Sequence, residues 1–332
     1  ACGGNTGSSA PAGDSSTAGG STAAESITYW STWTSEEPQA KVIAEAAAAF
    51  EENTGIHVNI EWKGRDITTI LAAALDGGED IDVFDDDFQR MSSPTQFAPY
   101  CYDLEEMAAA VGYDDFAVAA LPTAVRRWSG SLTCIPYQPY TSGVFFTMSS
   151  FEKAGLVDEN GNAIVPTTWD EFLTTCQALK GAGYTALAQD DAYTMYTYGF
   201  LLARLIGQEA VSTLVKEGGW AANEAAKQAA QAIVDLKENG YLSSTSPDAY
   251  PAGENEIGFG TASMVINASW VPSEITSNTD CNETWGFFNF PDMGGTDPAT
   301  VANIGAQAMA VNKNSANPQA AFDFIMFLTT GE

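Results

Sequence analysis

The sequence has one histidine, few basic residues and no long apolar run. Its 13 lysines and arginines stand against 43 aspartates and glutamates, which gives a formal net charge of -30. Such a charge repels nucleic-acid phosphates and anionic lipid headgroups, so no nucleic acid is expected as a partner. No stretch approaches the roughly 20 apolar residues that a membrane-spanning helix needs. The composition therefore argues against both a nucleic-acid-binding and a membrane-spanning protein.

The common motifs of catalytic and metal sites are also missing. The sequence contains no GxSxG, Walker A or HExxH segment, and no two cysteines have the CxxC spacing. His57 falls in a predicted strand with no evident partner, so a zinc site is not expected. We therefore predict a protein that is not an enzyme and that holds no cofactor and no metal.

Four cysteines follow the first 24 residues: Cys101, Cys134, Cys176 and Cys281. If all four are bridged, three pairings are possible. Cys176 lies on the apolar face of a predicted helix, where we expect a buried thiol. Cys101 and Cys134 flank one predicted lobe and are the pair that we favour for a disulfide.

Residues 1–24 contain no aromatic or large aliphatic side chain and are mostly Gly, Ser, Thr and Ala. Such a segment cannot bury enough surface to offset its ordering entropy, so we expect a flexible tether, with the fold beginning near Ser26. Cys2 stands at the head of this tether, as in a bacterial lipoprotein after removal of its signal peptide, with Ala1 just before the cleavage point. The alternative is a stray thiol, which suits an oxidising environment badly. We expect a lipid on Cys2 to anchor the chain to the outer face of the bacterial cytoplasmic membrane, at the cell surface.

The first part of the chain after the tether alternates between strand and helix patterns. The patterns predict strands at residues 27–30, 58–62 and 81–84, with helices at 35–52 and 66–75 between them. This order favours an α/β lobe with a largely parallel sheet, and ligand groups are expected at the carboxyl ends of its strands.

A second lobe is expected after Pro136. Thr168 and Glu171 match a capping box, which predicts a helix at 169–180, and an Ala-rich helix is expected at 223–239. Buried strands are expected at 184–187, 264–266, 287–290 and 306–311, and a helix from Pro318 to near the end of the sequence.

Several segments, spread over residues 28–332, resemble one known family. Among them are DIDVFDDDFQRM, TTWDEFL, GTASMVINASWVPSE and NIGAQAMAVNKNSANPQAAFDFIMFLTTGE. Their sequences, order and spacing resemble those of the sugar-binding proteins of bacterial ABC importers, the family that includes maltose-binding protein.

The resemblance implies an α/β, two-lobed periplasmic-binding-protein-like fold with interlobe crossing strands and a ligand cleft. By analogy, lobe 1 comprises residues 25–137 together with 303–332, and lobe 2 comprises residues 138–302. Members of the family usually continue for several more helices after the LTTGE-like segment, and these helices complete the second lobe. We therefore expect lobe 2 of this sequence to be incomplete at its C-terminus.

A sugar site needs planar aromatic rings for stacking and carboxylates or amides for hydrogen bonds. Trp33 follows the first predicted strand, where the family places ligand contacts. Asp86 and Asp87 follow the third strand, with Arg90 close enough to orient or neutralise one of them. The alternatives for this acidic run, a solvated loop or a calcium site, stay open.

The resemblance implies further contacts at the crossing segments and in the second lobe: Tyr140, Asp190, Asp191, Tyr193, Trp270, Gly305 and Gln307. Trp270 corresponds to the family's stacking tryptophan, and its alternative is a core tryptophan with a satisfied indole N–H. We expect core positions for the tryptophans within or at the start of predicted elements: Trp30, Trp62, Trp169 and Trp285. Trp220 is left undecided.

The family resemblance implies a monomer that captures a sugar or oligosaccharide by hinge closure and delivers it to ABC-transporter permease subunits. The alternative is a binding protein for a cationic peptide or polyamine, which the acidity favours slightly. However, the carboxylates are spread along the whole chain, which favours solubility as their purpose. A cationic ligand would bind with a steep salt dependence and a neutral sugar with almost none.

Overall fold

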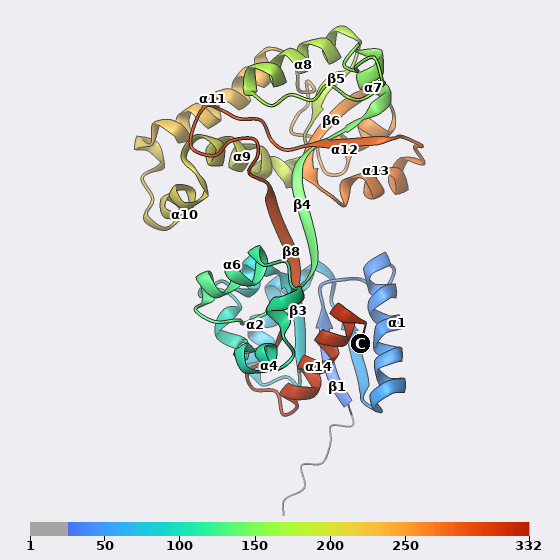
Figure 1. The fold of residues 1–332 in the computed structure, drawn as a ribbon, viewed down its shortest axis with the longest axis vertical. Helices are drawn as coiled ribbons and strands as arrows, with labels where there is room; N and C mark the ends of the chain where they lie inside the picture. Colours follow the sequence, from blue (N-terminus) through green and yellow to red (C-terminus); the bar gives the residue numbers. More distant parts are fainter. Residues whose placement is uncertain (1–25, 332) are drawn as a thin grey trace, which may run out of the picture. The chain divides into compact units, whose positions relative to one another are not determined.

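The computed structural model describes residues 26–331 (Figure 1). The predicted tether and Cys2 lie outside the described residues. The chain divides into two compact units: the first contains the described residues up to Phe84 and those from Val311 onward, and the second contains Asp85–Ala310. The lobe boundaries expected at residues 137 and 302 stay a prediction.

The first unit has the predicted alternation of strands and helices. Strand β1 (Ser26–Ser31) pairs in parallel with β2 (His57–Trp62) on one side and with β3 (Val83–Asp87) on the other, the last residues of β3 belonging to the second unit. Its helices are α1 (Pro38–Thr54), α2 (Ile67–Gly77) and α14 (Pro318–Thr330). The sequence-based prediction of this βαβαβ order is confirmed.

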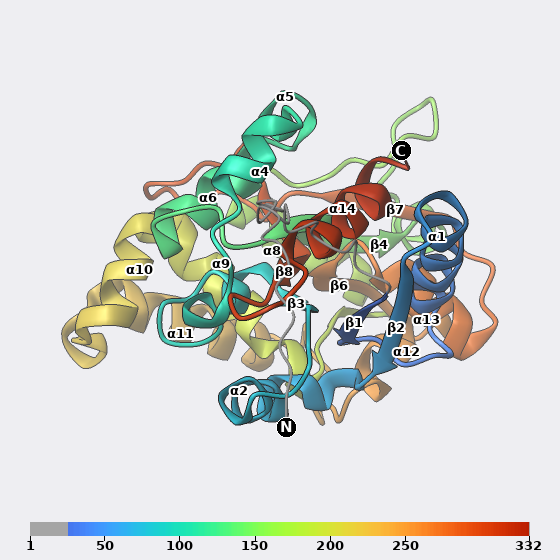
Figure 2. The same cartoon turned by 90° about the horizontal axis from the view of Figure 1, so that it is seen from below.

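The C-terminal helix completes the core of the first unit. Pro38 occupies the first turn of α1, where its missing N–H costs no hydrogen bond, and Gly55 ends the helix in the left-handed region at φ 76°. Phe50 on the buried face of α1 packs edge-on against Phe324 of α14, with ring centroids 5.5 Å apart. In Figure 2, α1 lies beside β2, in agreement with their packing.

Strand β4 (Ile135–Thr147) organises the sheet of the second unit. Its first half pairs antiparallel with β8 (Asn303–Val311), and the two strands run side by side in Figure 1. Its second half pairs with β6 (Ala262–Ala268) on one edge and with β7 (Trp285–Phe288) on the other. The short strand β5 (Thr185–Ala188) continues this sheet in parallel beyond β6.

The longer helices of the second unit are α6 (Ala120–Ser129), α8 (Trp169–Gly181), α9 (Thr194–Ile206), α10 (Gln208–Glu217), α11 (Glu224–Glu238) and α13 (Val271–Thr279). The shorter ones are α3 (Phe88–Met91), α4 (Glu105–Ala110), α5 (Tyr113–Phe116), α7 (Met148–Lys153) and α12 (Ala252–Gly258). The capping box expected at α8 is present, because Thr168 accepts from the backbone of Glu171 and Glu171 accepts from that of Thr168. The predicted Ala-rich helix is α11, which Asn223 caps.

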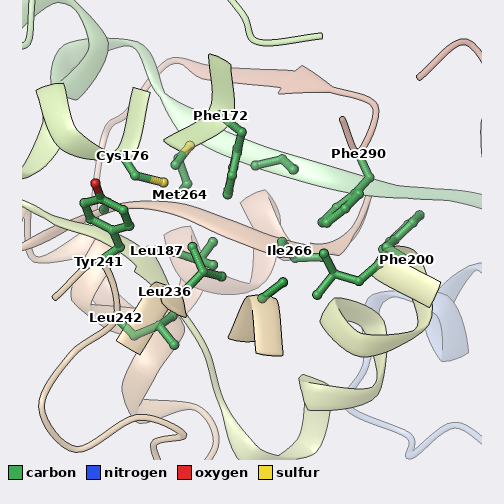
Figure 3. Packing of buried hydrophobic residues seen from close by; sticks show 14 of the residues in the cluster. Phe172, Cys176, Leu187, Phe200, Leu236, Tyr241, Leu242, Met264, Ile266 and Phe290 are labelled. Atoms are coloured by element: carbon green, nitrogen blue, oxygen red, sulfur yellow. The ribbon is translucent and has the colours of Figure 1, made fainter. Parts of the chain in front are cut away.

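Aromatic rings and aliphatic side chains fill the main core of the second unit (Figure 3). Phe200 of α9 stacks on Phe290 with ring centroids 5.1 Å apart and planes 5° apart. Phe172 of α8 packs against the same ring. Cys176 lies in this core as a fully buried thiol, which confirms its prediction.

Three expectations from the sequence are wrong. No disulfide joins Cys101 and Cys134 in the described part of the chain: Cys134 is a buried thiol, and the Cys101 thiol donates to the carbonyl of Phe97 at 3.3 Å. His57 has a partner, since its Nδ1 lies 2.9 Å from Oε2 of Glu51. The strand expected at 287–290 ends earlier, at Phe288. The carbonyl of Phe290 accepts hydrogen bonds from the Arg204 side chain instead of from the backbone of a neighbouring strand.

Among residues 26–331, no helix combines the length and the apolar character that crossing a membrane requires.

Candidate functional site

Five aromatic residues gather in the second unit around the middle of β4. Tyr140 of β4 meets Trp270 edge-to-face, with centroids 4.9 Å apart and planes at 76°. Tyr193 lies 5.6 Å from Tyr250 and 6.1 Å from Tyr196, measured between ring centroids. Burial raises the pKa of the Tyr193 hydroxyl, and the nearby Trp270 side chain opposes that rise. We call Tyr140, Tyr193, Tyr196, Tyr250 and Trp270 the aromatic cluster.

Strand pairing places Trp270 beside Tyr140. Ala268 at the end of β6 pairs with Ser142 of β4, and one residue further Ser269 N–H donates to the carbonyl of Thr141 at 2.9 Å. Trp270 then becomes the N-cap of α13, with Pro272 in the first turn of that helix. The indole is half-buried and rests on the small core beneath α12 and α13. It therefore has both a packing role and an accessible part.

The ring of Tyr140 lies flat against the backbone of the neighbouring strand. Gly305 of β8 is its cross-strand partner, and a Cβ added to Gly305 would stand 2.2 Å from Cζ of Tyr140. No side chain other than hydrogen fits there. Gly305 therefore lies against the Tyr140 ring, and its expected approach to a ligand stays a prediction.

The carboxylate of Asp87, the last residue of β3, binds the hydroxyl end of Tyr140. The Tyr140 hydroxyl donates to Oδ2 of Asp87 at 2.7 Å, and Oδ1 of Asp87 accepts from the backbone of Gln89 at 2.9 Å. Burial raises the pKa of Asp87, and the Tyr140 hydrogen bond opposes that shift. Burial together with the nearby Asp87 raises the pKa of Tyr140, so the phenol keeps its proton.

Arg90 neutralises the fully buried Asp86. Its Nε and Nη2 both reach Oδ1 of Asp86, at 2.9 and 2.5 Å. Burial alone would lower the pKa of Arg90, but the hydrogen bonds and attraction of Asp86 raise it overall. The other oxygen of Asp86, Oδ2, is buried and has no hydrogen-bond partner among the described residues.

Further polar atoms without partners lie on β4 and β8. Gln138 and Gln307 face each other across the two strands, and the side-chain oxygen of each is buried without a hydrogen bond among residues 26–331. The hydroxyl oxygen of Ser142 is also buried without a hydrogen-bond partner among these residues. A buried polar atom without a partner is costly, so these atoms provide hydrogen-bonding capacity for a polar ligand or water.

A second acidic group adjoins Tyr193 and Tyr250. Asp190 is fully buried and caps α12, accepting from the backbone of Gly253 at 2.6 Å and of Glu254 at 2.9 Å. Asp191, which begins the 3-10 turn Asp191–Tyr193, accepts from the backbone of Tyr250 at 3.1 Å. These two carboxylates therefore fix the backbone that carries Tyr193 and Tyr250.

A family model described as bacterial extracellular solute-binding protein matches residues 33–332. The chain belongs to this family. It is thus a solute-binding protein, and the family to which it belongs is one of transport rather than of catalysis. No curated protein sequence matches the chain.

Solved structures share the fold at low sequence identity. A protein studied for xylan utilisation by the thermophilic bacterium Caldanaerobius polysaccharolyticus has a TM-score of 0.75 and 21% identity over 92% of this chain and 78% of its own. RafE from Streptococcus pneumoniae, in its apo form, has a TM-score of 0.74 and 21% identity over 94% and 78%. A chitin oligosaccharide binding protein has a TM-score of 0.73 and 19% identity over 92% and 77%. This similarity confirms the α/β fold of the two-lobed solute-binding proteins.

Of the predicted ligand contacts, all but Trp33 belong to the second unit of this solute-binding protein. Asp86 pairs with Arg90, which lies near Asp87 and Tyr140. Asp87 accepts from the Tyr140 hydroxyl, and the Tyr140 ring contacts Trp270 and Gly305. Trp33 belongs to the first unit, where it is 7% exposed and the Arg65 guanidinium lies 4.8 Å from its ring centroid.

The other tryptophans have mixed positions. Trp30 is buried as expected, while Trp169 and Trp285 are half-buried against the cores of the second unit. Trp62 is half-buried and lines a shallow groove beside α1. Trp220, left undecided by the sequence, is 39% exposed.

Sequence reasoning did not identify Tyr196, Tyr250, Glu254 and Glu274 as neighbours of the site. Tyr250 and Glu254 flank Pro251 in a stretch without strand or helix periodicity, and Glu274 lies in a short helix of mixed character. The Tyr250 hydroxyl donates to Oε1 of Glu274, a residue 24 positions later. The only usable signal was the segment GTASMVINASWVPSE, whose final glutamate is Glu274.

The described residues contain no group of three or more His, Cys, Asp or Glu side chains arranged to hold a metal ion.

We expect Gly305→Ala to destabilise the second unit by about 1–3 kcal/mol, because the added methyl overlaps the Tyr140 ring. The cost should disappear when Tyr140 is first replaced by alanine, which leaves room for the methyl. Denaturant unfolding of the native protein and the three variants in this cycle measures the coupling. Gly199→Ala is the control, since a Cβ there meets no atom within 4 Å. Equal costs in both backgrounds would contradict the steric explanation.

Proposed function

We propose that this solute-binding protein captures a sugar or oligosaccharide and delivers it to the permease subunits of an ABC transporter. The observation that carries the proposal is the Tyr140–Trp270 ring pair, which has the carboxylate of Asp87 bonded to its tyrosine. An indole offers a face to the C–H side of a pyranose, and carboxylates and amides accept or donate hydrogen bonds at the hydroxyls.

The polar atoms around the pair support the same ligand class. Asp86, Gln138, Gln307 and Ser142 each present a buried oxygen without a hydrogen-bond partner among the described residues. A sugar hydroxyl both donates and accepts, so it suits such atoms better than an apolar solute would. Two structural neighbours, one studied for xylan utilisation and one a chitin oligosaccharide binding protein, agree with this class.

We further propose that ligand binding is coupled to hinge closure and causes no chemical change in the sugar. A ligand shifts a conformational equilibrium only if it binds the closed state more tightly than the open state. Small-angle scattering should therefore show a smaller radius of gyration at saturating ligand. A radius that stays constant while calorimetry reports full occupancy would argue against closure, and release of shorter sugars from a bound oligosaccharide would argue for an enzyme.

Trp270→Ala should weaken sugar binding by roughly thirtyfold, corresponding to about 2 kcal/mol, because it removes the stacking face. A thermal-shift screen of mono- and oligosaccharides identifies a ligand, and calorimetric titration then compares the variant with the native protein. Trp220→Ala is the matched control, since that indole is 39% exposed and lies outside the aromatic cluster. Unchanged affinity together with a lower melting temperature would assign Trp270 to the core alone.

The lipid anchor on Cys2 is also a proposal, motivated by the Gly/Ser/Thr/Ala-rich stretch that follows it. A lipid-anchored, extracytoplasmic location fits a receptor that serves a membrane transporter. Cys2→Ala, expressed in the native host with its export signal, should move the protein from the membrane fraction to the medium. Sugar affinity should stay unchanged, because residues 1–24 offer no large side chain for packing. Persistent membrane association of the variant would exclude Cys2 as the anchor.

A further inference from the structure

A buried carboxyl group beside the aromatic cluster has no positive partner. Glu254 of α12 is 0% exposed, and its Oε1 has no hydrogen-bond partner among residues 26–331. Its Oε2 lies 3.4 Å from Nδ2 of Asn267, a long contact to a neutral amide. No lysine or arginine pairs with Glu254 or with Glu274 in the described part of the chain.

The groups that surround Glu254 are acidic or phenolic. They come from α13, from the segment after β5 and from the segment before α12: Glu274, Asp190, Tyr193 and Tyr250. Asp191, Asp248 and Glu256 lie near Asp190. Burial, reinforced by repulsion from Glu274 and Asp190, raises the pKa of Glu254 to about 8. Glu254 therefore carries a proton at neutral pH. A glutamine of the same shape has no charged form, so it would avoid the cost of burying an ionisable group.

Aromatic rings and a carboxylate adjoin this acid. Tyr193 and Tyr250 stand perpendicular to each other, at 86° with centroids 5.6 Å apart, and Tyr193 lies near Trp270. The Tyr250 hydroxyl bonds to Oε1 of the half-buried Glu274. Tyr250 is 44% exposed, so this side of the cluster is open to solvent. Aromatic faces beside a carboxylate are the surroundings that stabilise an ammonium group.

We propose that the solute bound at the aromatic cluster carries a protonated amino group, which lies between the tyrosine rings and Glu274, with Glu254 behind them. This inference rests on the proposed solute-binding function and narrows its ligand class. An amino sugar and a polyamine both supply an ammonium group, and the proposed sugar function favours the amino sugar. The ammonium charge supplies the missing positive partner for both carboxyl groups.

Binding then displaces one proton. In the free protein Glu254 is neutral, and the incoming positive charge favours its ionised form, so its proton passes to solvent. The affinity should rise with pH between about 5.5 and 7, where Glu254 is still protonated in the free protein and the amine is still charged. A neutral sugar would release no proton and show no such rise.

Calorimetric titration with matched pairs tests the ligand class: glucose and glucosamine, galactose and galactosamine, mannose and mannosamine, with spermidine as the polyamine. We expect the amino member of the pair with the accepted stereochemistry to bind at least about tenfold more tightly than its neutral partner at low salt. Equal or tighter binding of the neutral sugar overturns the ammonium proposal and leaves the sugar function standing. Binding of spermidine alone supports the ammonium site and overturns the sugar function. No binding of any probe overturns the ammonium proposal, while the screen of mono- and oligosaccharides tests the sugar function.

Two variants test the role of Glu254 with the best-binding amine. Glu254→Gln should lose about tenfold or more in affinity, abolish the rise between pH 5.5 and 7, and abolish proton release measured in buffers of different ionisation enthalpy. Glu256→Gln replaces a carboxyl group of the same helix about 200° around its axis, and should keep all three properties. Because glutamine matches the neutral acid in shape, the fold should persist, as a melt verifies. Proton release that survives in Glu254→Gln overturns the assignment.

Discussion

The site depends on the pairing of one strand with different partners along its length. Strand β4 runs against β8 in its first half and against β6 and β7 in its second half. Tyr140 lies two residues before Ser142, where the first pairing ends, so Gly305 lies against its ring and the end of β6 brings Trp270 beside it. A shift of one residue in either register would turn Tyr140 to the opposite face and separate the pair.

Negative charge is the second constraint on this region, and the protein neutralises most of it locally. Arg90 pairs with Asp86, the Tyr140 hydroxyl with Asp87, and the N-terminus of α12 with Asp190. Each of these interactions also fixes the position of the backbone or of a ring in the aromatic cluster. Glu254 is the exception, because protonation is the only means that the described residues offer for keeping it neutral. Burial of a carboxyl group without a positive partner is costly, which supports the role proposed for Glu254.

The packing of Trp270 is compatible with the stacking role proposed for it. Its indole covers a small core formed by side chains such as Val271 and Ile275, and it meets Tyr140 in an edge-to-face arrangement. A ring fixed by packing loses little freedom when a ligand stacks on it, which favours binding. The same argument applies to Tyr140, which Asp87 and Gly305 hold from two sides.

The sequence by itself determined the local features. Apolar periodicity and caps defined the first three strands, α1, and α8 with its capping box, because these depend on neighbours within a few positions. The family resemblance gave Tyr140, Tyr193 and Trp270, which the structure brings into one cluster. Only the tertiary structure decided that Cys101 and Cys134 form no disulfide and that Asp190 caps a helix. It alone placed Glu254 without a partner beside Tyr250 and Glu274, since those contacts join segments up to 64 positions apart whose meeting no local pattern records.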